Sequence, residues 1–436
     1  MVDIRKDYTK LKDVSEHFTE ETLRKIISTK LNGEYQSGET HVWEWEFDKA
    51  NAKGDNYLST VYKIKVTGIT GDKKDFYYLV VKSLPKNVGR RNTFRSVEFF
   101  QNEIMFYTKV IPKFEKFLID KGQEKILYTP RHLASCMDGE NDYIAMQDVT
   151  FLGYEPLSRQ NSMNGDQCAV ILKTIARFHA ISFAYKDQKK EEFTELMENL
   201  RETYFSKDHW NWYKRFHVRL TIIKTISDIT KNALAIEYPG SEAEKRYNSH
   251  KFGDLYHMAA EFCNRKYQPT SVICHGDCWA PNFLFRKVDE NHATMLDFQL
   301  ARCASPIVDL STCIYACTEK TLWDKQFDEL LKIYYNELSD TITLLGSNPE
   351  SLYSWDTFMM KSLQVKEQFI FGAIFAMEII PLSLLDESDT FDLDALISND
   401  TKVDIADVWT LSNIESQDGR RRLANVFLHA TQHGFL

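Results

Sequence analysis

The hydrophobic pattern changes along the chain, and this change limits the folds that the sequence can adopt. In the first third, β-branched and aromatic residues form three runs, at residues 41–50, 57–69 and 75–85. The segments NAKGDN and TGDKKD separate these runs, and both are rich in residues that favour tight turns. The pattern therefore predicts three sequential strands of an antiparallel sheet.

Beyond these runs, apolar residues recur at helical spacing. In residues 96–114 they fall three and four positions apart, which predicts a helix with one apolar face. Residues 142–154 predict a short strand that runs into a turn. Two short apolar runs around a loop occupy residues 271–300. Most of the remaining chain predicts helices, most clearly at 166–185, about 190–265, 320–346 and 356–385.

A sheet with one helix, followed by a long helical region, predicts a bilobal α+β fold. We expect a small antiparallel-sheet lobe over residues 1–147, a hinge over 148–154 and a larger, mainly helical lobe over 155–436. A chain of 436 residues, of which 43% are hydrophobic, is long enough to build two packed lobes.

Charge and hydropathy argue against several classes of protein. The net charge is −9, whereas a general nucleic-acid binder is normally basic, so we expect no nucleic-acid partner. Glu378 and Pro381 interrupt the longest apolar stretch, residues 369–385, which favours a buried helix over membrane insertion. The first residues, MVDIRKDYTK, lack the apolar segment of a signal peptide. We therefore expect a cytoplasmic protein, and no obligatory protein partner.

The eight cysteines fit the same expectation. No C-x-x-C motif occurs, and cytoplasmic thiols are normally reduced. The pairs Cys274/Cys278 and Cys313/Cys317 have a four-residue offset that could suggest zinc. Small buried residues in packed segments are the simpler interpretation, because cysteine is among the most buried residue types.

The stretch HGDCWAPN, followed by MLDFQ, carries the clearest chemical signal. Asn282 follows Asp277 by five residues, and Asp297 ends an apolar run fifteen residues later. Phosphoryl transfer needs a carboxylate for the hydroxyl proton and oxygen ligands for Mg²⁺. Asp277 suits the first role, and Asn282 and Asp297 suit the second. A single Asp–Asn pair is usually only a turn, but carboxylates beside apolar runs cost free energy unless a metal compensates.

A candidate phosphate-binding cation lies in the predicted sheet. Lys82 interrupts the apolar run YYLVVKSLP, where a lysine is unfavourable unless it is paired. Glu103 lies beside Phe100 and Tyr107 on the apolar face of helix 96–114, so it can face the sheet. In a kinase such a pair directs the lysine to the nucleotide phosphates. A surface salt bridge is the alternative interpretation.

Several motifs together resemble the ecdysteroid kinase-like family. CHGDCWAPNFLF, LDFQLAR and SPIVDLSTCIY are its most specific motifs, and VVKSLP, FQNEIMFYTKVIP and IARFHAISFAY fit the same family. The resemblance covers about residues 50–385. This family belongs with the choline kinases and aminoglycoside phosphotransferases, so the resemblance implies a protein-kinase-like fold.

The resemblance also implies roles for individual residues. Lys82 and Glu103 would orient the nucleotide, Asp277 would be the catalytic base, and Asn282 and Asp297 would bind metal. Asp309 resembles the family's aspartate that braces the catalytic loop, which is a structural role.

The chain departs from the protein-kinase pattern at two places. It has no G-x-G-x-x-G, so the phosphate loop must be NAKGDNYLST, with Gly54, Asn56 and Ser59 as candidate contacts. Gln299 stands in LDFQ where protein kinases have Gly, and no A-P-E segment follows, which argues for a small-molecule acceptor. The hinge MQDV, from Met146 to Val149, is expected to bind adenine through its backbone.

Two histidines near these motifs have simpler roles than catalysis. His275 adjoins Asp277 and could shuttle protons, but a loop-bracing hydrogen bond is the more economical interpretation. His179 lies in the apolar helix 166–185 and is predicted to be a core histidine.

The leading hypothesis is a kinase that uses ATP and Mg²⁺ to phosphorylate a hydroxyl of a small molecule. Within the family, steroid-like (ecdysteroid) and foreign alcohols are the expected acceptors, and Trp210, Trp212 and Trp279 could stack on a flat ligand or belong to the core. The acidic segment 384–400 could instead attract a cationic amino-alcohol such as choline, or be a solvated loop. Two further classes stay open: a non-catalytic pseudokinase, and a metal-dependent hydrolase using residues 274–278.

Overall fold

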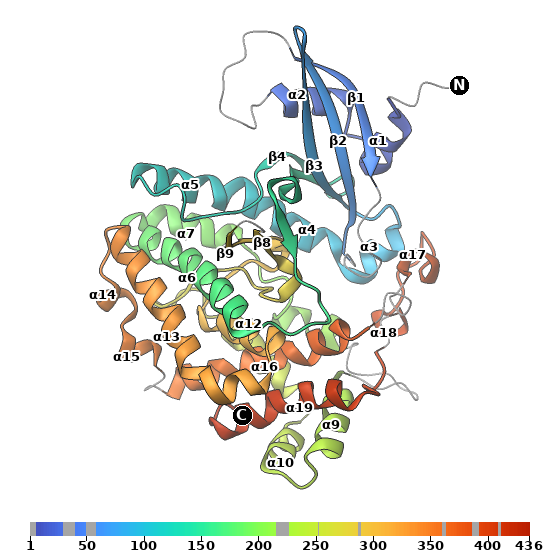
Figure 1. The fold of residues 1–436 in the computed structure, drawn as a ribbon. Helices are drawn as coiled ribbons and strands as arrows, with labels where there is room; N and C mark the ends of the chain where they lie inside the picture. The colour runs from blue at the N-terminus through green and yellow to red at the C-terminus, as the bar shows by residue number, and fades with distance from the viewer. Residues whose placement is uncertain are drawn as a thin grey trace. The chain divides into compact units, whose positions relative to one another are not determined.

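The computed structural model describes residues 6–28, 40–48, 58–214, 226–251, 253–286, 289–359, 363–385, 392–408 and 411–436. The chain divides into two compact units (Figure 1). The first contains residues 1–108, 129–154 and 387–403, and the second contains residues 109–128, 155–386 and 404–436. Two segments therefore lie in different units than the sequence-based bounds imply, namely 109–128 and 387–403.

The first unit is built on a five-stranded antiparallel sheet in the order β1-β2-β3-β5-β4. Its first three strands form the predicted meander, because Thr60–Thr70 pairs along its whole length with Lys73–Ser83. The strands are β1 (Thr40–Asp48), β2 (Thr60–Thr70), β3 (Lys73–Ser83), β4 (His132–Cys136) and β5 (Tyr143–Gln147).

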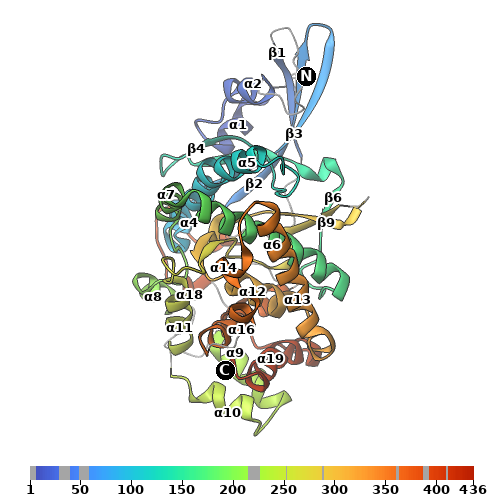
Figure 2. The same cartoon turned by 90° about the vertical axis from the view of Figure 1, so that its left-hand side faces the viewer.

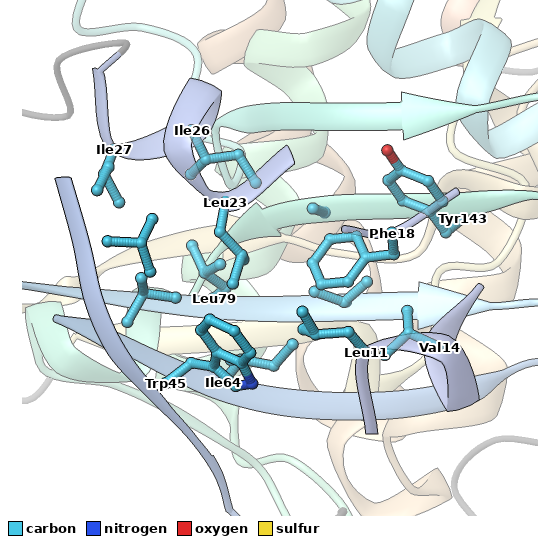
Figure 3. Close-up of a cluster of buried hydrophobic side chains, with 14 residues drawn as sticks. Leu11, Val14, Phe18, Leu23, Ile26, Ile27, Trp45, Ile64, Leu79 and Tyr143 are labelled. Atoms are coloured by element: carbon cyan, nitrogen blue, oxygen red, sulfur yellow. The ribbon is translucent and has the colours of Figure 1, made fainter. Parts of the chain in front are cut away.

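Two short N-terminal helices that the sequence analysis did not predict form much of the core of this unit. They are α1 (Tyr8–Val14) and α2 (Glu20–Ser28). Their apolar residues, with Phe18 between them, pack against sheet residues such as Trp45 and Leu79 in one buried cluster (Figure 3). Burial of this cluster at roughly 25 cal/mol per Å² stabilises the unit.

The predicted helix 96–114 is interrupted. Helices α3 (Val88–Phe94) and α4 (Ser96–Met105) lie in the first unit, a π-helical turn η1 follows at Phe106–Val110, and α5 (Ile111–Asp120) begins after it. Pro112 near the start of α5 has no N–H, so a continuous α-helical bond pattern is impossible there. Phe114 and Phe117 of α5 contact Tyr185, which explains why this segment belongs to the second unit.

The second unit is mainly helical. α16 packs against α12, α19 and α11, and α6 packs against α13 (Figure 2). The helices of eight or more residues, besides α5, are α6 (Gly165–Gln188), α7 (Lys190–Asn199), α9 (Ile226–Glu237), α10 (Glu242–Ser249), α11 (Asp254–Cys263), α12 (Ile307–Cys317), α13 (Lys320–Leu344), α16 (Leu363–Ser383) and α19 (Gln417–Gln432). Shorter ones are α8 (Trp210–Tyr213), α14 (Pro349–Tyr353), α15 (Trp355–Phe358) and α18 (Ile405–Val408), with 3-10 turns η3 (Lys207–His209), η5 (Ala280–Asn282) and η6 (Phe298–Leu300). The short helix α17 (Leu393–Leu396) and the 3-10 turn η2 (Val149–Leu152) belong to the first unit.

Two apolar helices form the centre of this unit. The stretch at 369–385 falls largely within α16, whose residues from Phe369 to Ile380 are buried, so the predicted buried helix is confirmed. Among the described residues, α6 is long and apolar enough to cross a membrane, but 78% of its apolar window is buried inside the protein. Its burial is that of a core helix.

Short strands carry the HGD and LDF motifs. β7 (Val272–Cys274) pairs with β10 (Arg302–Ala304), and β8 (Phe283–Arg286) pairs with β9 (Asp289–Met295). β6 (Tyr154–Pro156) joins β8 in a three-stranded sheet. The loop after β7 and the end of β9 therefore hold the candidate catalytic residues.

Candidate active site

Lys82 and Glu103 form a buried ion pair in the first unit. The Lys82 ammonium donates to both carboxylate oxygens of Glu103, at 2.8 and 3.1 Å. The two side chains are 10% and 2% exposed. Removing both charges from water is costly, and a buried pair is therefore weak evidence of stabilisation alone. A role in binding a nucleotide would explain why this pair is present.

The surrounding elements fix both partners. Lys82 lies on β3 between Val61 of β2 and Ile144 of β5, so its strand is paired on both sides. Glu103 lies on α4, and its helical neighbours Phe100 and Tyr107 are buried as the sequence predicts. An ammonium held between two strands and one helix has little freedom, which suits a group that must point at phosphates.

We expect Lys82→Met to lower the rate of phosphoryl transfer by roughly 10²-fold or more, the effect typical of removing one stabilising group from a charged transition state. Glu103→Gln should be milder, because it misplaces the lysine without deleting it. Steady-state rates with ATP check both expectations.

The control is the double variant Lys82→Met/Glu103→Gln. Lys82→Met alone removes the positive charge beside a buried carboxylate and should destabilise the fold by about 3–5 kcal/mol. The double variant removes both charges, so it should regain stability to urea but stay inactive. Full activity in all three variants would reduce the pair to a structural contact.

The other predicted nucleotide contacts are placed in part. Gly54 and Asn56 lie outside the described residues, whereas Ser59 is buried just before the Thr60–Ser83 pair of β2 and β3. Met146 lies opposite Val80, one residue before the end of β5, and Val149 begins η2. Within MQDV, the amide of Asp148 donates to the carbonyl of Tyr78, and the Asp148 side chain caps η2. Adenine binding by this segment stays a prediction.

The loop after β7 requires a glycine. Gly276 has a φ of +85°, in the left-handed region, and a Cβ built there would lie 1.9 Å from the carbonyl oxygen of Leu300. Only glycine fits both constraints without a shift of the backbone. The close approach holds the HGD loop against the segment that follows Asp297.

Asp277 is a buried carboxylate that one amide holds in place. Asn282 Nδ2 donates to Asp277 Oδ2 at 2.9 Å and to the Asp277 carbonyl at 3.0 Å. Burial and the nearby charge of Asp297 raise the pKa of Asp277 to about 7, although the bond from Asn282 lowers it. A carboxylate with this pKa is well matched to accept a hydroxyl proton.

Asp297 is brought beside this loop by the β8–β9 hairpin. The amide of Leu296 donates to the carbonyl of Asn282 at 2.8 Å, so Asp297 directly follows a residue bonded to the loop. Asp297 has a φ of +63°, a left-handed conformation that Asp and Asn adopt more readily than most residues. The sequence analysis placed this residue at a strand end but did not anticipate its backbone conformation.

The donor set fits a divalent cation. Asn282 uses its amide nitrogen on Asp277, which leaves its amide oxygen as the group it can offer to a metal. The charge of Asp297 raises the pKa of Asp277, and a cation would relieve this repulsion. Carboxylate and amide oxygens are the ligands that Mg²⁺ accepts. Asn282 and Asp297 are the residues that would hold it.

Asp309 holds the loop after β7 in place through hydrogen bonds to its backbone. Its carboxylate accepts the backbone amides of His275 and Gly276, at 2.6 and 2.9 Å, and lies 3.1 Å from His179 Nε2. His179 also contacts the hydroxyl of Tyr334 at 2.7 Å. Asp309 therefore has the hydrogen bonds of a loop brace, and His179 is a core histidine that supports it.

His275 links the two chemical segments. Its Nδ1 accepts the amide of Asp277 at 3.2 Å, and its Nε2 lies 2.7 Å from the carbonyl oxygen of Leu296. Both ring nitrogens are used in the loop, which supports the bracing role.

Burial and nearby negative charge raise the pKa of Cys274, so it stays a neutral thiol. A zinc-dependent hydrolase would need these groups as metal ligands.

Arg302 was not predicted as a site residue. It is buried, donates to the carbonyl of Leu300 at 3.1 Å and to the sulfur of Cys263 at 3.0 Å, and lies 3.2 Å from a carboxylate oxygen of Glu202. Its positive charge lowers the pKa of Asp277. The LAR motif was its signal in the sequence, although no spacing argument gave it a function.

Glu378 is a second buried carboxyl that the sequence analysis did not assign to the site. Tyr204 donates to it at 2.5 Å, and Tyr213 donates to its other oxygen. Burial raises the pKa of Glu378 to about 7, and these two bonds lower it in part. Burial and the charges of Glu378 and, more weakly, Asp277 raise the pKa of Tyr204, which places this cluster in the electrostatic field of the catalytic loop.

The predicted aromatic residues belong to the same region. The Trp210 ring packs on Tyr256 at a centroid distance of 5.2 Å, and Trp212 packs on Tyr204 at 5.9 Å. Trp210 and Trp212 are partly exposed, as is Trp279. They are neither fully core residues nor fully solvated, so either role weighed from the sequence stays open.

Glu378 gives a pH prediction. Its pKa is higher in the folded state than its ordinary value of 4.5, so the folded protein binds more protons between pH 4.5 and 7. The free energy of unfolding should therefore fall by about 3 kcal/mol on this account as pH rises through that window. Urea unfolding of Glu378→Gln should lack this decrease, whereas the exposed control Glu191→Gln should keep it. Equal pH profiles for Glu378→Gln and the parent would contradict the assignment.

The two units together define a class of protein, the small-molecule kinases with a protein-kinase-like fold: an antiparallel sheet with one key helix in the first, and a mainly helical second unit. The profile of the ecdysteroid kinase-like family matches residues 53–347, more than half of the chain. The chain belongs to this family. Among curated proteins, no sequence matches the chain.

Several solved structures are similar to the chain. An ethanolamine kinase from Plasmodium vivax is 13% identical, with 89% of this chain and 81% of that chain covered and a TM-score of 0.39. A protein described as an aminoglycoside phosphotransferase of Ralstonia eutropha is 13% identical, with 94% of this chain and 98% of that chain covered and a TM-score of 0.40. The GDP and kanamycin complex of APH(2″)-IIIa is 12% identical, with 95% of this chain and 99% of that chain covered and a TM-score of 0.37. These similarities are too distant to assign any residue of this chain.

Proposed function

We propose that the protein transfers the γ-phosphoryl group of ATP to a hydroxyl group of a small molecule. The observation that carries this proposal is the Asp277–Asn282 pair, a buried carboxylate held at 2.9 Å by a side chain that can also bind metal. The buried Lys82–Glu103 pair supports it independently, because it supplies an oriented cation in the other unit.

In this reaction Asp277 accepts the proton of the acceptor hydroxyl. The hydroxyl oxygen then forms a bond to the γ-phosphorus as the bond from that phosphorus to the β-bridging oxygen breaks, and ADP leaves. Lys82, held by Glu103, neutralises charge on the α and β phosphates. Asn282 and Asp297 would hold Mg²⁺, which offsets negative charge on the phosphates when it is bound. Backbone groups of residues 146–149 would bind adenine.

A phosphate loop completes the proposed nucleotide site. Gly54, Asn56 and Ser59 remain its candidate residues, and Ser59 is the one that the structure describes. It lies beside the β2–β3 pairing that contains Lys82. A reducing compartment such as the cytoplasm is proposed on the basis of the eight free cysteines, seven of them buried.

We further propose an apolar alcohol, steroid-like or foreign, as the acceptor. The aromatic cluster around Tyr204, Phe205 and Phe375 offers a ring-rich environment in the second unit. Burying a few hundred Å² of a flat ligand at about 25 cal/mol per Å² outweighs one exposed charge contact. Of the acidic segment, Asp386, Glu387 and Asp389 lie outside the described residues, and Asp394 is paired with Arg90 in the first unit.

A cationic amino-alcohol is the second candidate acceptor, and Glu378 is the observation that favours it. Its carboxyl accepts hydrogen bonds from the hydroxyl groups of Tyr204 and Tyr213, and a carboxylate beside aromatic residues can bind an ammonium group. With a pKa of about 7, Glu378 is protonated and neutral in a fraction of the molecules near neutral pH, which weakens its attraction for a cation.

The test is transfer of labelled phosphate from ATP to a panel of steroids, choline-like amines and foreign alcohols. We expect phosphorylation of an apolar alcohol that Glu378→Gln retains. Phosphorylation of amines, lost in Glu378→Gln, would establish the second candidate. A nucleotide that binds without transfer to any acceptor or to water would instead indicate a pseudokinase.

A further inference from the structure

The chain returns to the first unit long after the sheet is complete, and it docks there on one short helix. Residues 392–403, named here the α3 strap, follow α16 and contact α3. They include part of the acidic segment that the sequence analysis considered as a solvated loop or an acceptor contact. About 310 residues of chain separate the two partners.

Backbone hydrogen bonds join the α3 strap to the start of α3. The amide of Gly89 donates to the carbonyl of Asn399 at 2.7 Å, and the amide of Val88 donates to the Asn399 side chain at 3.1 Å. Asn87, which caps α3, donates to the carbonyl of Ile397 at 2.6 Å. These bonds use amides at a helix N-terminus that have no partner within the helix.

Gly89 allows this close approach. A Cβ at this position would lie 2.3 Å from the carbonyl oxygen of Ser398 and 2.6 Å from that of Thr401. Any larger residue must therefore push the α3 strap away. The close approach of two strap carbonyls therefore gives a physical reason for a glycine at this position.

Side chains extend the contact along the same face. Arg90 forms an ion pair with Asp394 at 2.9 Å, and the Arg90 side chain is 8% exposed. Thr93 exchanges hydrogen bonds with Val403, at 3.1 and 3.3 Å. Residues 89, 90 and 93 lie on one face of α3, and all three contact the strap.

On the other side of α3, Arg91 donates to the carbonyl of Glu140 at 2.9 Å. Val88, Arg91 and Asn92 line a cavity of about 500 Å³ in the first unit. Their spacing of three and four places them together on the helix surface. Because part of this side of α3 borders open space, the hydrogen bonds and the ion pair of the α3 strap help to fix the helix.

A shift of α3 would be transmitted directly to α4, the helix that bears Glu103. Arg95 alone separates α3 from α4, and its left-handed backbone, with a φ of +55°, sets a sharp turn between them. Asn87, at the other end of α3, lies five residues after Lys82 on the same chain. The docked helix is therefore the connection between the two members of the ion pair.

We propose that the α3 strap positions Glu103 for catalysis, with Arg90 and Asp394 as positioning residues that act through α3 and α4. This inference rests on the proposed function, in which Glu103 orients Lys82 on the nucleotide. It assigns the acidic segment to the nucleotide-binding unit, not to acceptor recognition.

The first test compares Asp394→Asn with Asp400→Asn. Both changes remove one negative charge from an exposed side chain of the α3 strap, but Asp394 pairs with Arg90. We expect Asp394→Asn and Arg90→Ala to lower kcat/KM for ATP by about 2- to 30-fold, the range reported for residues that modulate a distant site. KM for the acceptor and the activity of Asp400→Asn should stay unchanged. Equal effects of the two Asn variants would overturn the proposal.

Gly89→Ala is the second test. Alanine favours the α3 helix itself, so a loss of activity cannot come from a weaker helix. We expect a drop in kcat/KM for ATP with α3 intact, and a strap that trypsin cleaves faster at Lys402. Unchanged ATP kinetics with faster cleavage would show that the strap only seals the unit.

A double-mutant cycle with Glu103→Gln separates positioning from general destabilisation. If the strap acts through Glu103, Asp394→Asn should cause little further loss of kcat/KM in the Glu103→Gln background. Full additivity would contradict the proposal. The variant Lys82→Met distinguishes failure of this proposal from failure of the proposed function. If Lys82→Met has no effect on activity, the proposed function is wrong. If Lys82→Met is inactive while the strap variants are fully active, only the proposal for the α3 strap is wrong.

Discussion

Replacing Asp277 with asparagine should lower phosphoryl transfer by about 10²- to 10⁴-fold, the contribution typical of a positioned general base. Asparagine keeps the shape of the side chain and an oxygen that can accept the bond from Asn282, but it cannot take a proton at neutral pH. The rate of phosphate transfer from ATP measures this loss. Nucleotide affinity should change little, because the proposed role of Asp277 is to contact the acceptor hydroxyl and not the nucleotide.

Stability provides the control for this variant. Burial and the charge of Asp297 make ionised Asp277 unfavourable, so its neutral replacement should unfold at a urea concentration no lower than the parent's. An inactive protein of unchanged or greater stability would exclude unfolding as the cause. Activity within about tenfold of the parent would remove Asp277 from the role of base, because such a value lies below the range expected for general base catalysis.

The fold was predictable where local pattern and tertiary structure agree. Strands β2 and β3 combine apolar and β-branched residues with turn residues between them, and both are found within a few residues of their predicted bounds. Helix α6 was predicted from its apolar run. In these segments the same residues that favour the local conformation also fill the core, so one signal serves both.

Long-range packing explains what the sequence did not reveal. Residues 392–403 were assigned to the helical lobe by their position in the chain, yet they dock on α3, and no pattern within an acidic segment indicates a partner 310 residues away. Pro112 is the residue within the predicted helix 96–114 that indicates an interruption of the α-helix. The contacts of α5 with Tyr185 then decide that this segment joins the second unit.

The candidate site shows the same division. The spacing of Asp277, Asn282 and Asp297 was informative because one loop and one hairpin hold all three. Glu378 and Arg302 carried no comparable signal, since each reaches the site through packing of elements that are distant in sequence. A charged residue in an apolar helix indicates burial, but its partner can be identified only in the folded structure.

Asp297 gives the prediction with the second largest effect. We expect Asp297→Asn to lose the gain in ATP affinity that Mg²⁺ provides and to lower turnover by about 10²-fold or more, because a bound cation offsets several kcal/mol of charge in the transition state. Asparagine tolerates a φ of +63° almost as well as aspartate, so the backbone should keep its conformation. Titration calorimetry with ATP, with and without Mg²⁺, measures the effect.

Asp297→Ala is the comparison variant. It removes both side-chain oxygens, whereas Asp297→Asn removes the charge but keeps one amide oxygen, and alanine also disfavours the left-handed backbone by roughly 1–2 kcal/mol. Both variants should bind ATP equally with and without Mg²⁺, whereas only the alanine variant should lose stability to urea. This pattern would separate the metal ligand from the strained backbone at one position. If Asp297→Ala kept tight Mg²⁺-dependent binding of ATP, the Asp297 oxygens would not be ligands, and the bend at Asp297 would have to be explained by packing alone.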